Sequence, residues 1–557
     1  MGASGRLIYV TGPSRTGVRT ALRKYVRYLE ERDVRNPGLP RIVELERHLE
    51  DIASDAVQHV LGRRQPTLFR IMQLPKALLN ELWLEAFELC LEEAKKARAE
   101  GHDVLLTFHA VWYHHQNREY VSAVNFARLQ KRDAKADLVL TLIDDIYDVR
   151  ARLSEQHGLF EHALNESLSE LEDMVLKLLL VLDWRTTEVL ISEKIASLCT
   201  PCNGHFVLAV KHPLATLHAL LQAAPPPTVY LAHPISEPKM MQRLGVEREA
   251  QRAMQDIQDM AAKLRESTVL FEPTAIDEAR LVFEVVSADK KLVVPLLGRR
   301  WPLAVDEQYL LFVPPSSRTE GEFGTQWVAK SKEVVDAQAN NHPIPYRQEL
   351  RSTSGLLRIL QDTIVRHINQ RDHKLIDQAD HLVVWRPYFR GKLATGVQEE
   401  LQYHDRLFRS GKRNNAAIVF HPAEDERGRP REAVRSFLSN YSADEAKIDI
   451  AVQAIQPEQL TSERTRLEVG RHIRAAAETA GINLLPPQPK GALQKQKALW
   501  IQEQDEQLAG EFRQVLRSYL CDLTEGSVEI IEQDLKPLAF AERAVDKIRK
   551  HARVESR

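Results

Sequence analysis

The chain has 557 residues, of which 43% are hydrophobic, and a formal net charge of −2 at pH 7. This length predicts roughly two to four domains, and the balanced charge argues against a nucleic-acid or acidic-membrane partner. The longest apolar run, 174–182, is interrupted by Lys177 and is about half the roughly 18 to 20 residues of a membrane span. Residues 1–6 contain no signal-peptide core, and four cysteines are too few for a disulfide framework, so we predict a cytoplasmic protein.

Short apolar runs alternate with long helical patterns through residues 1–223, the first expected domain. Such alternation is typical of a parallel sheet with helices on both faces. The expected strands are 7–11, 104–108, 138–143 and 206–210. Leucine and valine at steps of three and four predict a long helix through 164–182. The proline-rich segment 223–227 marks the expected boundary.

The first expected strand runs into a glycine-rich turn, Gly12–Thr20. Its spacing matches the phosphate-binding pattern GxxxxGK[ST], in which backbone N–H groups hold phosphate and the lysine reaches the outer phosphates. Val18 stands at the lysine position and Arg19 at the hydroxyl position. The turn therefore predicts a loop that binds a phosphate or one that merely folds, with Arg15 or Arg19 as the candidate replacement cation.

This turn resembles the GPPGSGKGT loop of the adenylate-kinase-like nucleotide kinases, and Gly12, Pro13, Gly17 and Thr20 match it. Residues 137–145, with the arginines that follow, resemble the strand and arginine pair that lead into the lid of that family. The resemblance covers about the first 220 residues and implies nucleotide binding, with Mg and ATP as the cofactors to expect. The phosphate-binding residues that it implies are Gly12, Arg15, Gly17, Arg19, Thr20, Arg150 and Arg152. The missing lysine argues against phosphoryl transfer by the usual arrangement.

Two smaller groups in this domain have the residue types of metal ligands. His109, His114 and His115 follow the expected strand 104–108 and are metal ligands or polar residues at a strand end. We favour the second interpretation, because no cysteine or carboxylate stands beside them at a ligand-like spacing. Cys199, Cys202 and His205 resemble half a zinc site or a redox pair, without the second pair that zinc needs. We predict no metal site.

Residues 228–424 form the second expected domain, with strands at 228–232, 269–272, 382–385 and 417–420. An insertion at about 274–350 is too long for a simple loop. It contains the apolar strands 292–297 and 309–313, and we expect a subdomain or a lid.

Three segments of this domain occur in the order of a known superfamily. Residues 230–234 read YLAHP, residues 372–380 end in an alanine and an aspartate, and residues 396–400 read GVQEE. They resemble the nucleoside 2-deoxyribosyltransferase and 2'-deoxynucleoside 5'-phosphate N-hydrolase superfamily. The resemblance implies Glu400 as nucleophile, Asp372 as the carboxylate that contacts the base, and Tyr230 as the residue that orients the glutamate. His233 replaces a glycine of the pattern and Ala394 replaces a small polar residue.

The expected chemistry needs these residue types. Cleavage of an N-glycosidic bond builds positive charge on the sugar, which a carboxylate stabilises or traps, and a second carboxyl group protonates the leaving base. Thr395, Gly396 and Val397 open a helix and would offer N–H groups to a 5'-phosphate, with Arg386, Arg390 and Lys392 as added cations. These cations favour a nucleotide over a nucleoside. Alternatively, Glu399 and Glu400 are acids stabilised by the helix dipole.

Residues 425–557 are expected to be mostly helical, with an apolar face through 493–519 that packs internally or supports a homo-oligomer. The predicted fold class is α/β: a P-loop parallel-sheet domain, a Rossmann-like deoxyribosyltransferase-type domain and this helical region. The predicted function is cleavage or transfer at the N-glycosidic bond of a (deoxy)nucleotide, with a nucleotide or nucleoside phosphate as partner and neither nucleic acid nor membrane. The alternatives are a nucleotide kinase or NTPase that uses the first domain, and a non-catalytic nucleotide sensor or scaffold in stress or antiviral defence.

Overall fold

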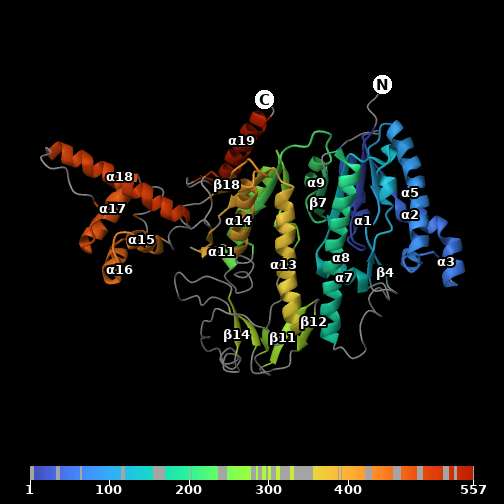
Figure 1. The fold of residues 1–557 in the computed structure, drawn as a ribbon, viewed down its shortest axis with the longest axis horizontal. Helices are drawn as coiled ribbons and strands as arrows, with labels where there is room; N and C mark the ends of the chain where they lie inside the picture. The colour runs from blue at the N-terminus through green and yellow to red at the C-terminus, as the bar shows by residue number, and fades with distance from the viewer. Residues whose placement is uncertain are drawn as a thin grey trace. The chain divides into compact units, whose positions relative to one another are not determined.

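A computed structural model gives the architecture of the chain. It describes all residues except 1–4, 33–37, 63–65, 115–118, 155–169, 202–203, 236–246, 277–283, 287–290, 297–298, 303–308, 314–325, 331–354, 387, 390–391, 421–429, 456–458, 460–465, 486–493, 519–525, 532–535 and 556–557. The chain divides into two compact units. The first comprises Met1–Pro225, Pro273–Phe312 and Trp327–Gln378, and the second comprises Pro226–Glu272, Val313–Gln326 and Ala379–Arg557. Each unit contains one five-stranded parallel sheet, so the protein is of the α/β class (Figure 1).

The sheet of the first unit has the strand order β2-β3-β1-β6-β7. Its strands are β1 (Leu7–Thr11), β2 (Arg41–Glu44), β3 (Val104–Thr107), β6 (Leu138–Ile143) and β7 (His205–Ala209). Every residue of β1 is buried, as expected for a central strand that is covered on both faces. The predicted strands are found to within a residue at each end, and β2 is an additional edge strand that the sequence analysis missed.

Helices cover both faces of this sheet because successive side chains of a strand point to opposite sides. Tyr9 of β1 contacts Phe87 of α5 (Lys76–Ala99), with ring centroids 6.0 Å apart, and Thr11 is hydrogen-bonded to Ser192 of α8 (Glu170–Cys199). Ile8 faces the opposite side, toward α1 (Val18–Glu30) and α9 (Leu214–Leu220). The remaining helices of residues 1–225 are α2 (Leu45–Ile52), α3 (Ser54–Leu61), α4 (Leu68–Ile71), α6 (Phe126–Leu129), η1 (Arg132–Ala134) and α7 (Ile146–Ser154).

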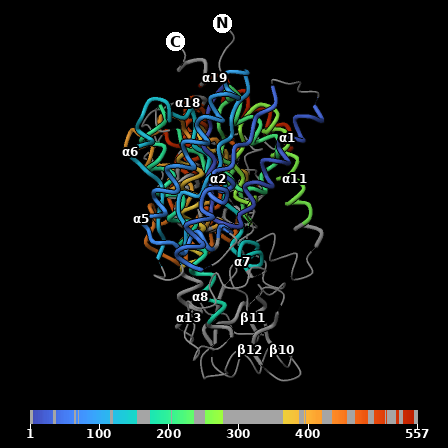
Figure 2. Tube along the Cα trace, turned by 90° about the vertical axis from the view of Figure 1, so that its right-hand side faces the viewer, coloured from blue at the N-terminus to red at the C-terminus, as the bar shows by residue number. Residues whose placement is uncertain are grey.

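A later helix covers the β7 edge of this sheet. α13 (Gly355–Asp377) lies beside α8 (Figure 1 and Figure 2). At its end, the side-chain amide of Gln378 accepts from Val207 N and donates to Val207 O, both at 2.8 Å. This amide takes the place of a neighbouring strand, so the edge is protected against pairing with another chain.

The insertion contains strands, as predicted. β10 (Glu284–Val286), β11 (Lys291–Leu296) and β12 (Arg299–Pro302) form an antiparallel sheet, and β13 (Tyr309–Val313) pairs with β14 (Gln326–Lys330). Two further hairpins are β4 (Trp112–His114) with β5 (Glu119–Val121), and β16 (Tyr388–Phe389) with β17 (Lys392–Leu393).

The sheet of the second unit has the strand order β19-β18-β15-β8-β9. Its strands are β8 (Thr228–Ala232), β9 (Val269–Phe271), β15 (His381–Trp385), β18 (Ala417–Phe420) and β19 (Val528–Ile531). Val229 and Leu231 share a core with α11 (Glu247–Arg265) and α19 (Pro537–Glu555), whereas Tyr230 points to the other face. The described part of region 425–557 is mostly helical, and it also contains the strand β19, which the sequence analysis missed and which completes this sheet.

Between β18 and β19 the chain forms a helical bundle with its own core. Its helices are α15 (Pro430–Ser439), α16 (Glu445–Ala454), α17 (Arg466–Thr479) and α18 (Gln494–Ser518). At Gly470, a Cβ atom would lie 1.7 Å from the carbonyl oxygen of Asp505, so α17 and α18 approach too closely for any larger residue. None of the helices in the described ranges combines the length with the apolar composition that a membrane crossing requires.

Candidate functional site

The second sheet reverses its direction of growth between β8 and β15. The connection after β8 leads to β9 on one side, and the connection after β15 leads to β18 on the other. In open parallel sheets, ligands bind beyond the carboxyl ends of the strands at such a switch point. Because β15 and β18 are parallel, the helix between them, α14 (Thr395–Arg409), runs back along the sheet and begins at this carboxyl edge.

Two of the predicted catalytic residues meet on this face of the sheet. The Tyr230 hydroxyl, on β8, donates a 2.6 Å hydrogen bond to Glu400 Oε1, on the second turn of α14. Tyr230 is 0% exposed and Glu400 is 7% exposed. A hydrogen bond donated to a carboxylate stabilises its ionised form and fixes its orientation. The structure therefore brings Tyr230 and Glu400 into direct contact, and their predicted roles as orienting residue and nucleophile stay predictions.

The first turn of α14 holds the residues expected to bind phosphate. Thr395 is the first residue of the helix, and its side chain lies outside the described part of the structure. Gly396 is exposed, and a Cβ atom built there would meet nothing within 4 Å. Val397 is buried in the core. Gly396 is thus exposed, with open space beside its Cα atom.

Backbone geometry marks the end of β15. Arg386 has φ 49°, in the left-handed region that non-glycine residues avoid, and its guanidinium carbon lies 5.6 Å from the centroid of the Trp385 ring. Such a conformation costs on the order of 1–3 kcal/mol and is concentrated at functional sites. Arg390 lies outside the described residues, as does the side chain of Lys392. His233, which replaces the glycine of the motif, is buried and donates from Nδ1 to Pro234 O at 3.1 Å.

Asp372 belongs to the first compact unit, on α13. Its Oδ1 accepts hydrogen bonds from Arg371 Nε at 2.9 Å and from Arg371 Nη2 at 2.8 Å, and both side chains are buried. The pair of residues that the structure brings together is therefore Tyr230 and Glu400. The contact of Asp372 with a base stays a prediction.

The glycine-rich turn Gly12–Thr20 occupies the corresponding switch point of the first sheet, between β1 and β3. A carboxylate that the sequence analysis did not single out supports it. Glu188 of α8 accepts from Gly12 N at 2.9 Å and from Ala110 N at 2.9 Å through Oε1, and from Val111 N at 2.8 Å through Oε2. Burial raises the pKa of Glu188 to about 7, although His109 and the three N–H donors lower it. Glu188 thus joins the ends of β1 and β3.

Two of the predicted phosphate-binding cations contact the protein itself. Arg152 Nη1 donates to Arg15 O at 2.5 Å and to Thr16 O at 3.0 Å, while its Nη2 contacts Asp144. Arg19 forms an ion pair with Glu44, at the end of β2. These contacts fix the turn through its carbonyl groups and balance both guanidinium charges with carboxylates.

The other predicted residues of the turn differ in exposure. Thr20 is exposed on α1, and Arg150 of α7 is buried, which lowers its pKa. Gly17 caps α1 with φ 90°, where glycine is needed, and Arg15 has φ 66°. Gly12 is buried, and a Cβ atom there would lie 2.5 Å from Leu142 O.

The histidines and cysteines of the first unit have structural contacts. His109 Nδ1 donates to Gly12 O at 2.6 Å, and His114 Nε2 donates to Leu74 O at 3.3 Å. His115 and Cys202 lie outside the described residues, and Cys199 is buried. Within the described ranges, no three His, Cys, Asp or Glu side chains are grouped as a metal site would require.

A pattern in α8 could have revealed Glu188. Glu188 and Ser192 are one helical turn apart, on the face that also buries Trp184 and Ile195. Polar residues on the buried face of a helix need partners in the core. Ser192 begins a chain of hydrogen bonds under the turn, which continues through Thr11 Oγ1 and Thr141 Oγ1 to His205 Nε2 in steps of 2.7, 2.9 and 2.9 Å.

Comparison with family models finds no match to this chain, and comparison with curated proteins finds none either. The two resemblances therefore depend on the motifs quoted above and on the geometry that surrounds them.

Proposed function

We propose that the second unit cleaves or transfers at the N-glycosidic bond of a (deoxy)nucleotide, with Glu400 as the carboxylate that acts on the anomeric carbon. The observation that carries this proposal is the buried 2.6 Å hydrogen bond from the Tyr230 hydroxyl to Glu400 Oε1. It lies beside the switch point of a parallel sheet, where ligands of such folds bind. An acid that merely stabilised the helix dipole would not need a buried tyrosine as its partner.

In the proposed reaction, a Glu400 oxygen bonds to the anomeric carbon as the bond from that carbon to the base nitrogen breaks. The departing base takes a proton from a general acid. Water or an acceptor base then attacks the same carbon, gives up a proton and releases the Glu400 carboxylate. Tyr230 holds the glutamate in position and stabilises its negative charge before attack and after release.

The start of α14 favours a nucleotide over an uncharged nucleoside. Its first N–H groups have no partner within the helix, and the positive end of the helix dipole favours an anion. Gly396 is exposed in this turn, and among the described residues outside its own turn no atom lies within 4 Å of the position of an added Cβ. A 5'-phosphate at this turn would place the sugar on the side of the sheet that carries Glu400.

The test is release of free base from a panel of ribonucleotides and deoxyribonucleotides, followed by chromatography. Glu400→Gln removes the carboxylate charge at nearly constant shape, and we expect release to fall by roughly a thousandfold. Glu399→Gln is the matched control, because it changes the neighbouring acid of the same helix, and it should retain most of the activity. Absence of release from every nucleotide, or equal activity of both variants and wild type, would refute the proposal.

A second candidate function concerns the first unit, and we propose that it senses a nucleotide or acts as a scaffold without phosphoryl transfer. The supporting observation is that Arg19, a candidate replacement for the missing lysine, forms an ion pair with Glu44, and that Arg152, another predicted phosphate-binding residue, contacts Asp144. Nucleotide binding without turnover is the expected result. Mg-dependent phosphoryl transfer that Arg19→Ala abolishes would instead establish a kinase.

A further inference from the structure

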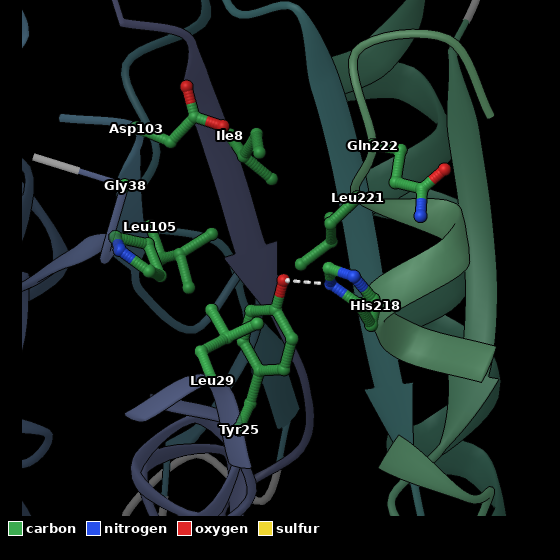
Figure 3. A pocket seen from close by; sticks show the side chains of 10 residues that line it. Ile8, Tyr25, Leu29, Gly38, Asp103, Leu105, His218, Leu221 and Gln222 are labelled. Atoms are coloured by element: carbon green, nitrogen blue, oxygen red, sulfur yellow. Dashed lines mark hydrogen bonds between the residues drawn. The ribbon is translucent and has the colours of Figure 1, made fainter. Parts of the chain in front are cut away.

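The first unit contains a cavity of about 180 Å³ at the edge of its sheet opposite the glycine-rich turn (Figure 3). Ile8 and Leu105, which are direct neighbours in the pairing of β1 with β3, form its apolar floor. Asp103 precedes β3 and Pro40 precedes β2, so the opening lies at the amino ends of the strands. This cavity is thus separate from the carboxyl edge, where the glycine-rich turn lies.

Helices α1 and α9 form walls of the cavity, and they contribute the polar groups of Tyr25 and His218. Figure 3 shows Tyr25 of α1 and His218 of α9 pointing toward each other, and the Tyr25 hydroxyl lies 3.3 Å from His218 Nδ1. Leu29 and Leu221 complete the walls. Burial raises the pKa of Tyr25 and lowers the pKa of His218, so both side chains are uncharged near neutral pH.

An arginine outside the cavity holds its rim in place. Arg6 donates from its backbone N to Asp103 Oδ1 at 2.8 Å, from Nε to Asp103 Oδ2 at 3.1 Å, and from Nη1 to Gln222 O at 2.9 Å. These bonds pair the carboxylate of Asp103, which lines the cavity, with the guanidinium of Arg6. The rim is therefore formed before any ligand enters, and its charge is balanced.

We propose that this cavity binds a single uncharged heteroaromatic ring that both donates and accepts hydrogen bonds, the class that includes free pyrimidine bases. A cavity of about 150 Å³ holds one benzene ring, so one ring with polar substituents matches the size. Ile8 and Leu105 contact the ring face, while the Tyr25 hydroxyl and the Gln222 amide hydrogen-bond to its edge. An ionised ligand would lose its hydration without gaining a counter-charge. The inference does not depend on the N-glycosidic chemistry of the second unit.

The test is calorimetric titration of the full-length protein with uracil. We expect saturable binding that Tyr25→Phe weakens about five- to tenfold, because the ring is kept and one hydrogen-bonding group is lost. Tyr28→Phe is the matched control. Tyr28 lies on the same helix outside the cavity lining, its buried hydroxyl has no hydrogen-bond partner within the described chain, and this variant should bind as wild type does.

Two further ligands and one further variant complete the experiment. Orotate adds a negative charge to the same ring and should bind at least tenfold more weakly, and benzene, which lacks polar groups, should also bind more weakly. Glu400→Gln should leave uracil binding unchanged, which separates this site from the proposed catalytic one. The proposal is overturned if uracil does not bind, if orotate or benzene binds as tightly, if both tyrosine variants lose affinity equally, or if Glu400→Gln removes binding while Tyr25→Phe does not.

Discussion

Each parallel sheet has a buried glutamate near its switch point, and the two glutamates are held differently. In the first unit, Glu188 accepts three backbone N–H groups and uses both carboxylate oxygens. In the second unit, Glu400 Oε1 accepts from a side chain, the Tyr230 hydroxyl. A carboxylate bound by the backbone of two strand ends is part of the scaffold. The Glu400 carboxylate lies on a helix that begins at the carboxyl edge of the sheet, where we propose that the reaction takes place. Burial alone does not distinguish the two acids, whereas their hydrogen-bond partners do.

Glu188→Leu should produce the largest effect on stability. It leaves the N–H groups of Gly12, Ala110 and Val111 buried without an acceptor, at a cost of about 1–3 kcal/mol each, which relief of the buried charge partly offsets. We expect a loss of about 4 kcal/mol in the free energy of unfolding of the first unit. Urea unfolding with hydrogen exchange in peptides from β1 and β3 measures it. A loss below about 1 kcal/mol would contradict the scaffold role.

The pH dependence of stability gives a second test of the same carboxyl group. The pKa of Glu188 is about 7 in the folded protein against an ordinary value of 4.5, so the folded state favours the protonated form. The stability that this carboxyl group contributes is fully present below about pH 4.5 and is lost as the pH rises to 7. The total loss is on the order of 3 kcal/mol in the free energy of unfolding. Glu188→Gln has no such titration, and unfolding curves at pH 5, 6 and 7 should show a smaller decline. An equal decline in both proteins would assign the pH effect to other groups.

Gly12→Ala compares the phosphate-type turns of the two units. The added Cβ would lie 2.5 Å from Leu142 O, a backbone atom that cannot move cheaply, so we expect a loss of about 2 kcal/mol in the free energy of unfolding. Gly396→Ala is the control, because nothing lies within 4 Å of the new atom. Within α14 it should raise stability by about 0.5 kcal/mol. If the two variants lost the same free energy of unfolding in urea, the two turns would not differ in how closely their glycines are packed.

Tyr230→Phe should have the smallest effect on stability, together with a distinct effect on activity. Loss of one buried hydrogen bond to a carboxylate costs about 1–2 kcal/mol, and we expect base release to fall by roughly ten- to a hundredfold. Tyr441→Phe is a matched control. The Tyr441 hydroxyl donates a 2.6 Å hydrogen bond to Glu511 on the exposed surface of the helical bundle, where such a bond contributes little. If both variants lost activity to a similar extent, the effect of Tyr230→Phe would not come from its hydrogen bond to Glu400.

The sequence predicted the central strands of both sheets well because their burial leaves continuous apolar runs, as in 138–143 and 417–420. It missed β2 and β19, which are edge strands with polar residues such as Arg41 and Glu529 within them. Their strand character comes from pairing with neighbours that lie far away in the sequence, which local patterns do not contain.

The residues of the candidate sites also fall into those that the sequence revealed and those that it did not. Short motifs indicated Tyr230 and Glu400, because their chemistry is concentrated in two short segments. The place of Glu188 on the buried face of α8 could have marked it as a core acid, but its three donors come from two other loops of the sheet, which no local spacing connects to it. The contact of Arg152 with the carbonyl groups of the turn was missed for the same reason. A buried hydrogen-bond network depends on the tertiary fold, so it becomes visible only once the strands are arranged.

The pairing of β18 with β19 affects how the protein is made on the ribosome. The strands of the first sheet all lie between Leu7 and Ala209, whereas β19 follows β18 by about a hundred residues. At about 5–20 residues per second, translation needs roughly 5 to 20 s to supply this last strand. During that interval β18 is the unprotected edge of an unfinished sheet, ready to pair with another nascent chain. The helical bundle is synthesised within the same interval, so β18 keeps an exposed edge until the bundle has been made.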